Sequence, residues 1–346
     1  MDKHVSRRNV LKAGAASAGL MLGTAGSKAE AQELPDVWGE DFMLQWSPPE
    51  NLRRDLKPGK TPVRLSCQQY RLRNNGDMSF ADQIKAIRAA GYTATEAGSG
   101  GWRKTTDSER RELFSVLREH DVIFYNLHTW VNVIHPDMAK RAECQKHVCE
   151  AIEEADRLGM EFILTHTGGN SSTNNKDIPH PDNWTKETWQ KSVAALKQIL
   201  RDTSGSKVKL AIEAVNSCNN NNPQSHARLR EDVGDPRVGV CLDPVNMLHP
   251  GVVYRTTELV NLCFDLLGEN ILYAHAKDIE WTSMLPSFKG VVLGQGTMDY
   301  ETYLVRLSRM KSTRVLYIEH LPDELYEPSR KYIVETAARL GVTLYG

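Results

Sequence analysis

The sequence lacks a strong net charge, a membrane-spanning apolar run and cysteines at metal-binding spacing. A formal net charge of −1 over 346 residues gives no basic surface of the kind that nucleic-acid-binding proteins use. The small and apolar stretch 13–26 is shorter than the roughly 20 residues that cross a bilayer. The six cysteines contain no C-x-x-C pair, which argues against a zinc site built from cysteine pairs. We therefore expect no nucleic-acid partner and no stable membrane anchor.

The remaining composition is ordinary for a soluble globular protein, with 40% hydrophobic and 25% charged residues. The length suits one large α/β domain or two smaller domains. Cys241 and Cys263 lie in apolar contexts and are expected to be core residues. Disulfide bonds are compatible with an oxidising compartment, but nothing in the sequence requires them.

The first 31 residues have the pattern of an export signal. A basic segment, Ser6 to Lys12, precedes the small and apolar stretch 13–26, and Ala29 to Ala31 reads A-E-A. The pair Arg7-Arg8 resembles a twin-arginine signal, although Val10 stands where Phe is commoner. This resemblance implies export of an already folded protein to the periplasm. Without residues 1–31 the chain has 38 basic and 42 acidic residues, a net charge of −4.

Residues 32–60 contain four prolines and no sustained periodicity, which predicts an irregular N-terminal arm. From residue 61 onward, short apolar runs alternate with segments of helical period. Eight runs are expected to be strands: 63–69, 94–98, 122–128, 161–167, 208–215, 238–243, 271–277 and 315–321.

The helical segments have recognisable starts and stops. Ser79 is a predicted N-cap of a helix that ends at Gly91. Leu113, Phe114 and Leu117 form one apolar stripe in a second segment. The segments 142–159 and 185–202 follow the same pattern. Eight strand–helix units over 61–346 predict an α/β fold, a (β/α)8 TIM barrel. A doubly wound open sheet is the alternative, but no G-x-G-x-x-G follows the first predicted strand.

In a TIM barrel the carboxyl ends of the strands form the active site, and four consecutive predicted strands end in metal-binding side chains. These are Glu213, Asp243, His275 and Glu319. Three carboxylates and one imidazole suit Mn²⁺, Mg²⁺, Co²⁺ or Zn²⁺. Taken singly, each residue has a simpler explanation: a helix cap, an ion-pair partner, a turn before Pro244 or a core histidine. Their joint occurrence on adjacent strands favours a metal site.

The segments "AIEAVN", "VGVCLDPVN", "YAHAKD", "LGQGTMDYETYLVRL" and "YIEH" together resemble the xylose isomerase-like barrel superfamily, over about residues 61–346. This superfamily includes sugar isomerases, keto-sugar 3-epimerases, inosose-processing enzymes and the endonuclease IV group. Resemblance to the epimerases implies that Glu213, Asp243, His275 and Glu319 hold one divalent ion, Mn²⁺ first. It also implies that Glu213 and Glu319 are catalytic and exchange the substrate proton. The endonuclease IV branch has a further histidine ligand where this chain has Asn246.

Other polar groups at the expected barrel mouth are candidates for binding a small sugar or keto-sugar: His128, His166, Asn246, Lys277 and Asp278. Glu96 is a weaker candidate of the same kind. Trp102 and Trp130 are expected in neighbouring loops, where they would either stack on a sugar ring or close the barrel.

The leading hypothesis is a periplasmic, metal-dependent sugar or keto-sugar isomerase or epimerase that works through an enediolate. A 3-keto-glycoside lyase on the same site is the close alternative. A non-enzymatic sugar-binding protein and an endonuclease IV-like nuclease are the alternatives from other classes. A homo-oligomer is compatible with the sequence, which does not determine oligomeric state.

Overall fold

The structure is a computed structural model that describes residues 54–73, 78–171, 178–284 and 287–345. The predicted export signal and the larger part of the predicted arm, residues 32–53, lie outside these ranges. The remaining arm residues, 54–60, form neither helix nor strand. Within the described ranges no helix is both long and apolar enough to span a membrane.

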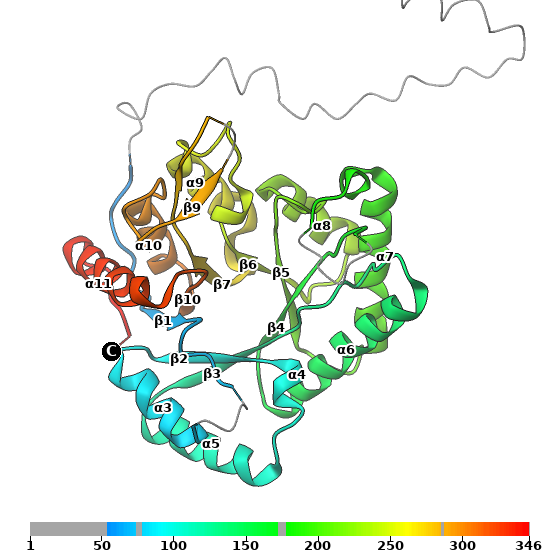
Figure 1. Ribbon diagram of the computed structural model, residues 1–346, viewed down its shortest axis with the longest axis horizontal. Helices are drawn as coiled ribbons and strands as arrows, with labels where there is room; N and C mark the ends of the chain where they lie inside the picture. Colours follow the sequence, from blue (N-terminus) through cyan, green and yellow to red (C-terminus); the bar gives the residue numbers. More distant parts are fainter. Residues whose placement is uncertain (1–53, 74–77, 172–177, 285–286, 346) are drawn as a thin grey trace, which may run out of the picture. The chain divides into compact units, whose positions relative to one another are not determined.

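Eight parallel strands form one sheet with the order β1-β10-β7-β6-β5-β4-β3-β2. They surround a central axis with the helices outside (Figure 1). Their bounds are β1 Val63–Cys67, β2 Ala94–Gly98, β3 Ile123–His128, β4 Phe162–His166, β5 Lys209–Glu213, β6 Val238–Leu242, β7 Ile271–Ala276 and β10 Arg314–Ile318. Each observed strand begins within two residues of the start of its predicted run and ends within three residues of the end of that run. The predicted (β/α)8 TIM barrel is confirmed.

The barrel is nearly closed. β1 and β10 pair along five residues, but β1 and β2 form no continuous ladder within the described residues. They are linked by the bond from the Thr93 amide to the Leu65 carbonyl, 3.1 Å long, and by one isolated bridge between Leu72 and Ala97. We call this junction the seam of the barrel.

Helices connect successive strands and pack around the sheet (Figure 1). Their bounds are α3 Phe80–Ala89, α4 Ser99–Trp102, α5 Asp107–Glu119, α6 Met138–Arg157, α7 Lys186–Asp202, α8 Pro223–Val233, α9 Thr256–Leu267, α10 Tyr300–Ser308 and α11 Asp323–Leu340. Short 3-10 helices η2 Pro181–Trp184, η3 Val245–Met247 and η4 Gly268–Asn270 occur in the connections.

The helix boundaries follow from local capping. The Ser79 side chain accepts the Asp82 amide at the start of α3, as the sequence predicts. Thr106 and Glu109 form a reciprocal capping box on α5. The helix expected from residue 142 begins earlier, at Met138, because Asp137 caps two amides there. The sequence analysis also missed a small antiparallel hairpin, β8 Ile279–Trp281 with β9 Phe288–Gly290.

The barrel interior is filled by side chains, so the chemistry must take place at its ends. One buried cluster contains residues from seven of the eight strands, including Tyr125, Phe162, Cys241, Tyr273 and Tyr317. The rings of Phe162 and Tyr273 stack with centroids 5.0 Å apart. A larger cluster fills the space between strands and helices. All six cysteines are free, and Cys241 and Cys263 are fully buried in the core, as expected.

Candidate metal centre

The structure brings the four predicted ligands together at the carboxyl ends of adjacent strands. Glu213 is the last residue of β5, Asp243 follows β6, His275 is in β7 and Glu319 follows β10. All four side chains are buried. One ligand atom from each lies within 4.8 Å of the corresponding atom of every other. This spacing follows from the parallel strands, which end at the same edge of the sheet.

His275 lies at the centre of this cluster. Its Nδ1 is 3.1 Å from Glu213 Oε1, 3.4 Å from Asp243 Oδ2 and 2.8 Å from Glu319 Oε1. Three buried carboxylates this close together require a compensating positive charge. Because the donors are three carboxylate groups and one imidazole, the set fits a divalent ion such as Mn²⁺, Mg²⁺ or Zn²⁺.

Lys277 also lies inside the ligand cluster. Its Nζ is 2.7 Å from Asp243 Oδ2 and 2.8 Å from Glu319 Oε1, and it donates a hydrogen bond of 3.0 Å to Asn246 Oδ1. Burial would lower the pKa of Lys277, but the charges of Asp243 and Glu319 outweigh burial and raise it. The ammonium group therefore stays charged and balances part of the acidic cluster.

The two glutamates of the cluster are held in their ionised forms. Burial opposes their charge, but His275 and His166 lower the pKa of Glu213 well below its usual range. His275 and Lys277 lower the pKa of Glu319 in the same way, against burial. Burial likewise opposes the charge on His275, but the neighbouring acidic groups Cys241, Glu319 and Glu213 raise its pKa. The site is thus an ionised network at neutral pH.

His166 and Asn246, predicted to bind substrate, both contact Glu213. His166 Nε2 lies 2.7 Å from Glu213 Oε2, and the Asn246 amide donates to Glu213 Oε1 over 2.8 Å. Each therefore fixes the orientation of that carboxylate. Asn246 is in η3 and fills the place of the additional histidine ligand expected for the endonuclease IV branch.

His128 and Glu96 form a second buried acid–histidine pair on β3 and β2. His128 Nδ1 is 3.1 Å from Glu96 Oε1. Glu96 Oε2 accepts the Asn126 amide at 2.9 Å and the Tyr125 hydroxyl at 3.2 Å. Against the effect of burial, His128 and Asn126 lower the pKa of Glu96. This pair extends the polar barrel mouth toward the seam.

Asp278 has a different environment from the other candidates. Its carboxylate accepts the backbone amides of Ile279, Gly294, Gly296 and Met298 at 2.8–3.1 Å. These four bonds occupy both oxygens, so Asp278 organises the connection between β7 and α10. Whether Asp278 also contacts substrate stays a prediction.

The two tryptophans differ in exposure. Trp102 is buried and donates its indole N–H to Glu154 Oε1 over 2.8 Å, so it belongs to the packing of the barrel wall. Trp130 is 44% exposed. Its ring centroid lies 5.6 Å from that of His128 and 5.8 Å from that of His166. Trp130 is therefore an accessible aromatic surface between two site histidines.

Two features were missed from the sequence. Lys277 was predicted to bind substrate, which stays a prediction, but its place inside the ligand cluster was not foreseen; it lies two residues after His275 in an extended segment, which places both side chains on one face. Cys241 forms a second potential donor set with Glu213 and His275, and burial raises its pKa to about 12. A buried core cysteine gives no sequence signal that separates it from a donor.

Comparison with known proteins agrees with this architecture. Residues 84–340, about three quarters of the chain, match the family described as "Xylose isomerase-like TIM barrel". A xylose isomerase-like TIM barrel protein from Mycobacterium smegmatis in complex with magnesium is similar, with a TM-score of 0.60 and 13% identity over 81% of this chain and 97% of that chain.

Two further solved structures share the fold. Endonuclease IV from Thermus thermophilus has a TM-score of 0.59 and 17% identity over 80% of this chain and 99% of its own. D-Psicose 3-epimerase from Clostridium cellulolyticum, solved with D-tagatose, has a TM-score of 0.59 and 12% identity over 81% and 100% of the two chains. At these identities the likeness shows the fold. Together with the match along most of its length, it establishes that this chain belongs to the xylose isomerase-like TIM barrel family.

Proposed function

We propose that this protein is a metal-dependent isomerase or epimerase of a sugar or keto-sugar. The observation that carries the proposal is the buried set of Glu213, Asp243, His275 and Glu319, whose ligand atoms lie within 4.8 Å of one another. Mn²⁺ is the ion we propose, because the donors are mixed oxygen and nitrogen. A similar barrel contains magnesium, and another, D-psicose 3-epimerase, was solved with a sugar.

A divalent ion bound by these residues would polarise the substrate carbonyl and acidify the proton on the neighbouring carbon. Glu213 and Glu319 are ionised, with lowered pKa values, so either carboxylate can accept that proton. His166 and Asn246 hold Glu213 in place. Lys277 contributes a buried ammonium group that can stabilise the negative oxygen of the enediolate.

The barrel mouth supports a sugar as substrate. Trp130 presents an exposed ring beside His128 and His166. An aromatic face of this kind packs against the apolar C–H face of a sugar ring, while polar neighbours bind its hydroxyl groups. His128 has its Nδ1 against Glu96, which fixes the ring for contact through Nε2.

The test is proton exchange in D₂O. The purified full chain with Mn²⁺ is incubated with a panel of aldoses, ketoses and 3-keto-glycosides, and deuterium uptake at carbon is measured by NMR. Uptake that requires metal and is lost in Glu213→Gln supports the proposal. Absence of metal-dependent uptake across the panel contradicts it. Release of a free aglycone from a 3-keto-glycoside would identify a lyase instead.

Elemental analysis of the purified protein separates the other classes. About one transition-metal ion per chain is expected for the proposed site. About three zinc ions, with cleavage of abasic duplex DNA, would indicate a nuclease. Sugar affinity without turnover, unchanged in Glu213→Gln, would indicate a binding protein.

We also propose export by the twin-arginine route, from the Arg7-Arg8 pair and the A-E-A sequence at 29–31. Replacing both arginines with lysine should leave the precursor in the cytoplasm, as measured by fractionation and immunoblotting. Normal accumulation of the double variant in the periplasm would contradict this route.

A further inference from the structure

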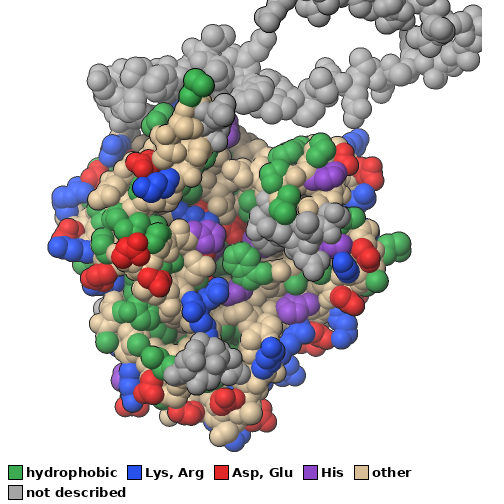
Figure 2. Space-filling model, viewed as in Figure 1, with side chains coloured by type: hydrophobic (Ala, Val, Ile, Leu, Met, Phe, Trp, Pro, Cys, Tyr) green, Lys and Arg blue, Asp and Glu red, His purple; other side chains and the backbone are tan. Residues whose placement is uncertain are grey.

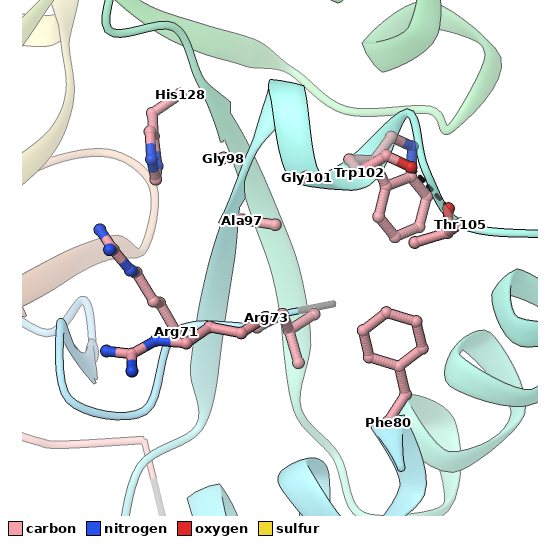
Figure 3. Close-up of a pocket in the computed structure, with 10 residues that line it drawn as sticks. Arg71, Arg73, Phe80, Ala97, Gly98, Gly101, Trp102, Thr105 and His128 are labelled. Atoms are coloured by element: carbon pink, nitrogen blue, oxygen red, sulfur yellow. Dashed lines mark hydrogen bonds between the residues drawn. The ribbon is translucent and has the colours of Figure 1, made fainter. Parts of the chain in front are cut away.

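A cavity of about 220 Å³ opens at the ends of β2 and β3, beside the seam of the barrel. His128 and Gly98 line one part, Phe80 and Trp102 another, and the segment 71–73 completes the wall. Figure 3 shows the guanidinium groups of Arg71 and Arg73 on the same side as His128, with the two aromatic rings on the other side. In Figure 2, Lys or Arg side chains lie next to histidines in the hollow at the centre of the visible face.

Arg71 and Arg73 have fixed backbones but unused side chains. The Arg73 amide donates to Gln83 Oε1 over 2.9 Å, and Gln83 Nε2 donates to the Arg73 carbonyl over 2.9 Å. The Leu72 amide between them donates to the Glu96 carbonyl over 2.8 Å. Neither guanidinium group, however, makes a hydrogen bond or ion pair with any residue that the structure describes; Arg71 is half-buried and Arg73 is exposed.

Two other half-buried arginines of this chain are paired with acids. Arg110 Nη1 is 3.0 Å from Glu154 Oε1, and Arg237 Nη2 is 2.9 Å from Asp235 Oδ2. The acid on the strand beside the cavity, Glu96, is already paired with His128 and hydrogen-bonded by Asn126. Two guanidinium groups in one wall, with no counter-ion among the described residues, form a site that is complementary to an anion.

From this geometry we propose that Arg71 and Arg73 bind an anionic group of the substrate, a carboxylate or a phosphate. The proposal rests on the proposed function, since the group belongs to the molecule that reacts at the metal centre. It adds that the substrate is an acidic sugar derivative. A guanidinium group donates two parallel hydrogen bonds to such an oxyanion, and two of them would also offset its charge.

The anionic group must lie away from the reacting carbonyl. His128 lines the cavity, Trp130 packs against both His128 and His166, and His166 contacts Glu213. This row crosses the barrel mouth from β3 to β5. With neighbouring strands ~4.8 Å apart, two spacings correspond to about 10 Å. The anion therefore sits at the far end of the substrate or on a group attached there.

Gly98 supports this arrangement. A Cβ atom on Gly98 would lie 3.2 Å from His128 Nε2, so with a side chain at this position the imidazole would have to shift away from β2. Glycine at 98 thus lets His128 lie against β2 at the edge of the cavity.

Binding of three defined probes tests the proposal: D-glucuronate, D-glucose 6-phosphate and uncharged D-glucose. Isothermal titration calorimetry is performed on the full chain, both loaded with Mn²⁺ and treated with a chelator. The proteins are the wild type, Arg71→Gln, Arg73→Gln and the double variant. Arg88→Gln is the matched control, because Arg88 is a half-buried arginine near the other end of α3.

We expect at least one anionic probe to bind about tenfold more tightly than D-glucose, as charged hydrogen bonds allow. The double variant should lose this preference, and Arg88→Gln should keep it. Tighter binding of D-glucuronate identifies a carboxylate, and tighter binding of D-glucose 6-phosphate a phosphate. Equal binding of all three probes to the wild type, or a preference that survives in the double variant, overturns the proposal.

This measurement is independent of turnover. If the arginine-dependent preference is present but no sugar shows metal-dependent deuterium uptake, the anion site stands and the proposed reaction fails. If a neutral sugar exchanges deuterium while no probe shows the preference, the reaction stands and the anion site fails. Circular dichroism and thermal unfolding of each variant show that the barrel is folded.

Discussion

The two halves of the barrel mouth have opposite electrostatic character. In one half, β5, β6, β7 and β10 end in Glu213, Asp243, His275 and Glu319, and Lys277 lies among them within 2.8 Å of two carboxylates. We call this the ligand half. In the other half, formed by β1 to β4, the arginine pair follows β1, the Glu96–His128 pair lies in β2 and β3, and Trp130 follows β3. We call this the recognition half.

The difference lies in how each half satisfies its charges. In the ligand half every acidic side chain has a cationic neighbour within 3.4 Å, so the protein itself compensates part of the buried negative charge. In the recognition half, one aromatic ring is 44% exposed and two guanidinium groups lack a partner within the described residues. Charged side chains that are paired within the protein are held in place for catalysis, whereas charged side chains without a partner are available to bind a substrate. Variants in the ligand half should therefore reduce kcat, whereas variants in the recognition half should raise KM.

The largest expected effect is from Glu319→Gln. It should lower kcat at least about a thousandfold, because it removes both a ligand and a proton acceptor. The barrel should remain folded, since β10 buries its apolar side chains independently and Lys277 keeps its contact with Asp243. Turnover and melting temperature are measured on one sample with excess Mn²⁺.

The control for this variant is Glu161→Gln, an exposed acid paired with Lys209 at the opposite end of the barrel strands. Glu161→Gln should change neither turnover nor melting temperature. If Glu319→Gln has wild-type turnover at saturating metal, Glu319 does not transfer the substrate proton. Loss of the fold would show that Glu319 is a structural ion-pair partner.

Lys277→Met tests the internal compensation of the ligand half. Removing a buried cation from its carboxylates should destabilise the metal-free protein by about 3 kcal/mol. The same change should increase Mn²⁺ affinity at least about tenfold, because no ammonium group then competes for Asp243 and Glu319. Urea unfolding with a chelator and calorimetric titration with Mn²⁺ measure the two effects.

Lys209→Met is the comparison, because the Lys209–Glu161 pair is at the surface, where such pairs contribute at most about 1 kcal/mol. Unchanged Mn²⁺ affinity in Lys277→Met would mean that Nζ and the metal ion do not compete.

The pH dependence of stability distinguishes the carboxylates of the ligand half from a buried histidine on α8, His226. Burial lowers the pKa of His226, on α8, from 6.5 to about 4. The unfolded chain therefore binds a proton as the pH falls below about 6.5, while folded His226 stays neutral until about pH 4. Stability due to neutral His226 is present above 6.5 and is lost on acidification, by about 3 kcal/mol at 1.36 kcal/mol per pH unit.

Glu213 and Glu319 have lowered pKa values, so they remain ionised between pH 7 and 5. They therefore cause no loss of stability in this range. In His226→Gln the free energy of unfolding, measured in urea at pH 7, 6 and 5, should consequently fall less steeply. His180→Gln, at a more exposed histidine, should keep the wild-type slope. An unchanged slope in His226→Gln would assign the acid sensitivity to another group.

The smallest effect is expected in the recognition half. Trp130→Ala should raise KM fivefold to tenfold and change kcat less than about threefold, since the ring packs on the sugar without taking part in proton transfer. Trp130→Phe should have a KM close to that of the wild type, because it keeps an aromatic ring at this position. Steady-state kinetics with the exchanging sugar measure both constants. A large fall in kcat for Trp130→Ala would contradict the division between the halves.

The sequence predicted the repeating pattern well, because strands buried on both faces are continuous apolar runs. It also predicted which side chains would meet in the ligand half, since parallel strands end at one edge. Whether Glu213, Asp243, His275 and Glu319 bind a metal stays a prediction.

The recognition half was less predictable. Arg71 and Arg73 sit in a connection whose path depends on Gln83 and Glu96, and no periodic pattern encodes that path. The surroundings of Asp278 were not predictable for a related reason. The sequence does not show that the amides of residues 279–298 fold back onto its carboxylate.

The seam between β1 and β2 has a consequence for how this protein can change during evolution. Elsewhere around the barrel, an inserted or deleted residue would shift a ladder and turn buried side chains outward. At the seam the backbones of the described residues are joined by the bond from Thr93 and the bridge at Leu72, so a change in length between Gln68 and Leu72 would shift no continuous ladder. Selection for a new substrate can therefore act on this segment while the acidic cluster on the far wall is inherited unchanged.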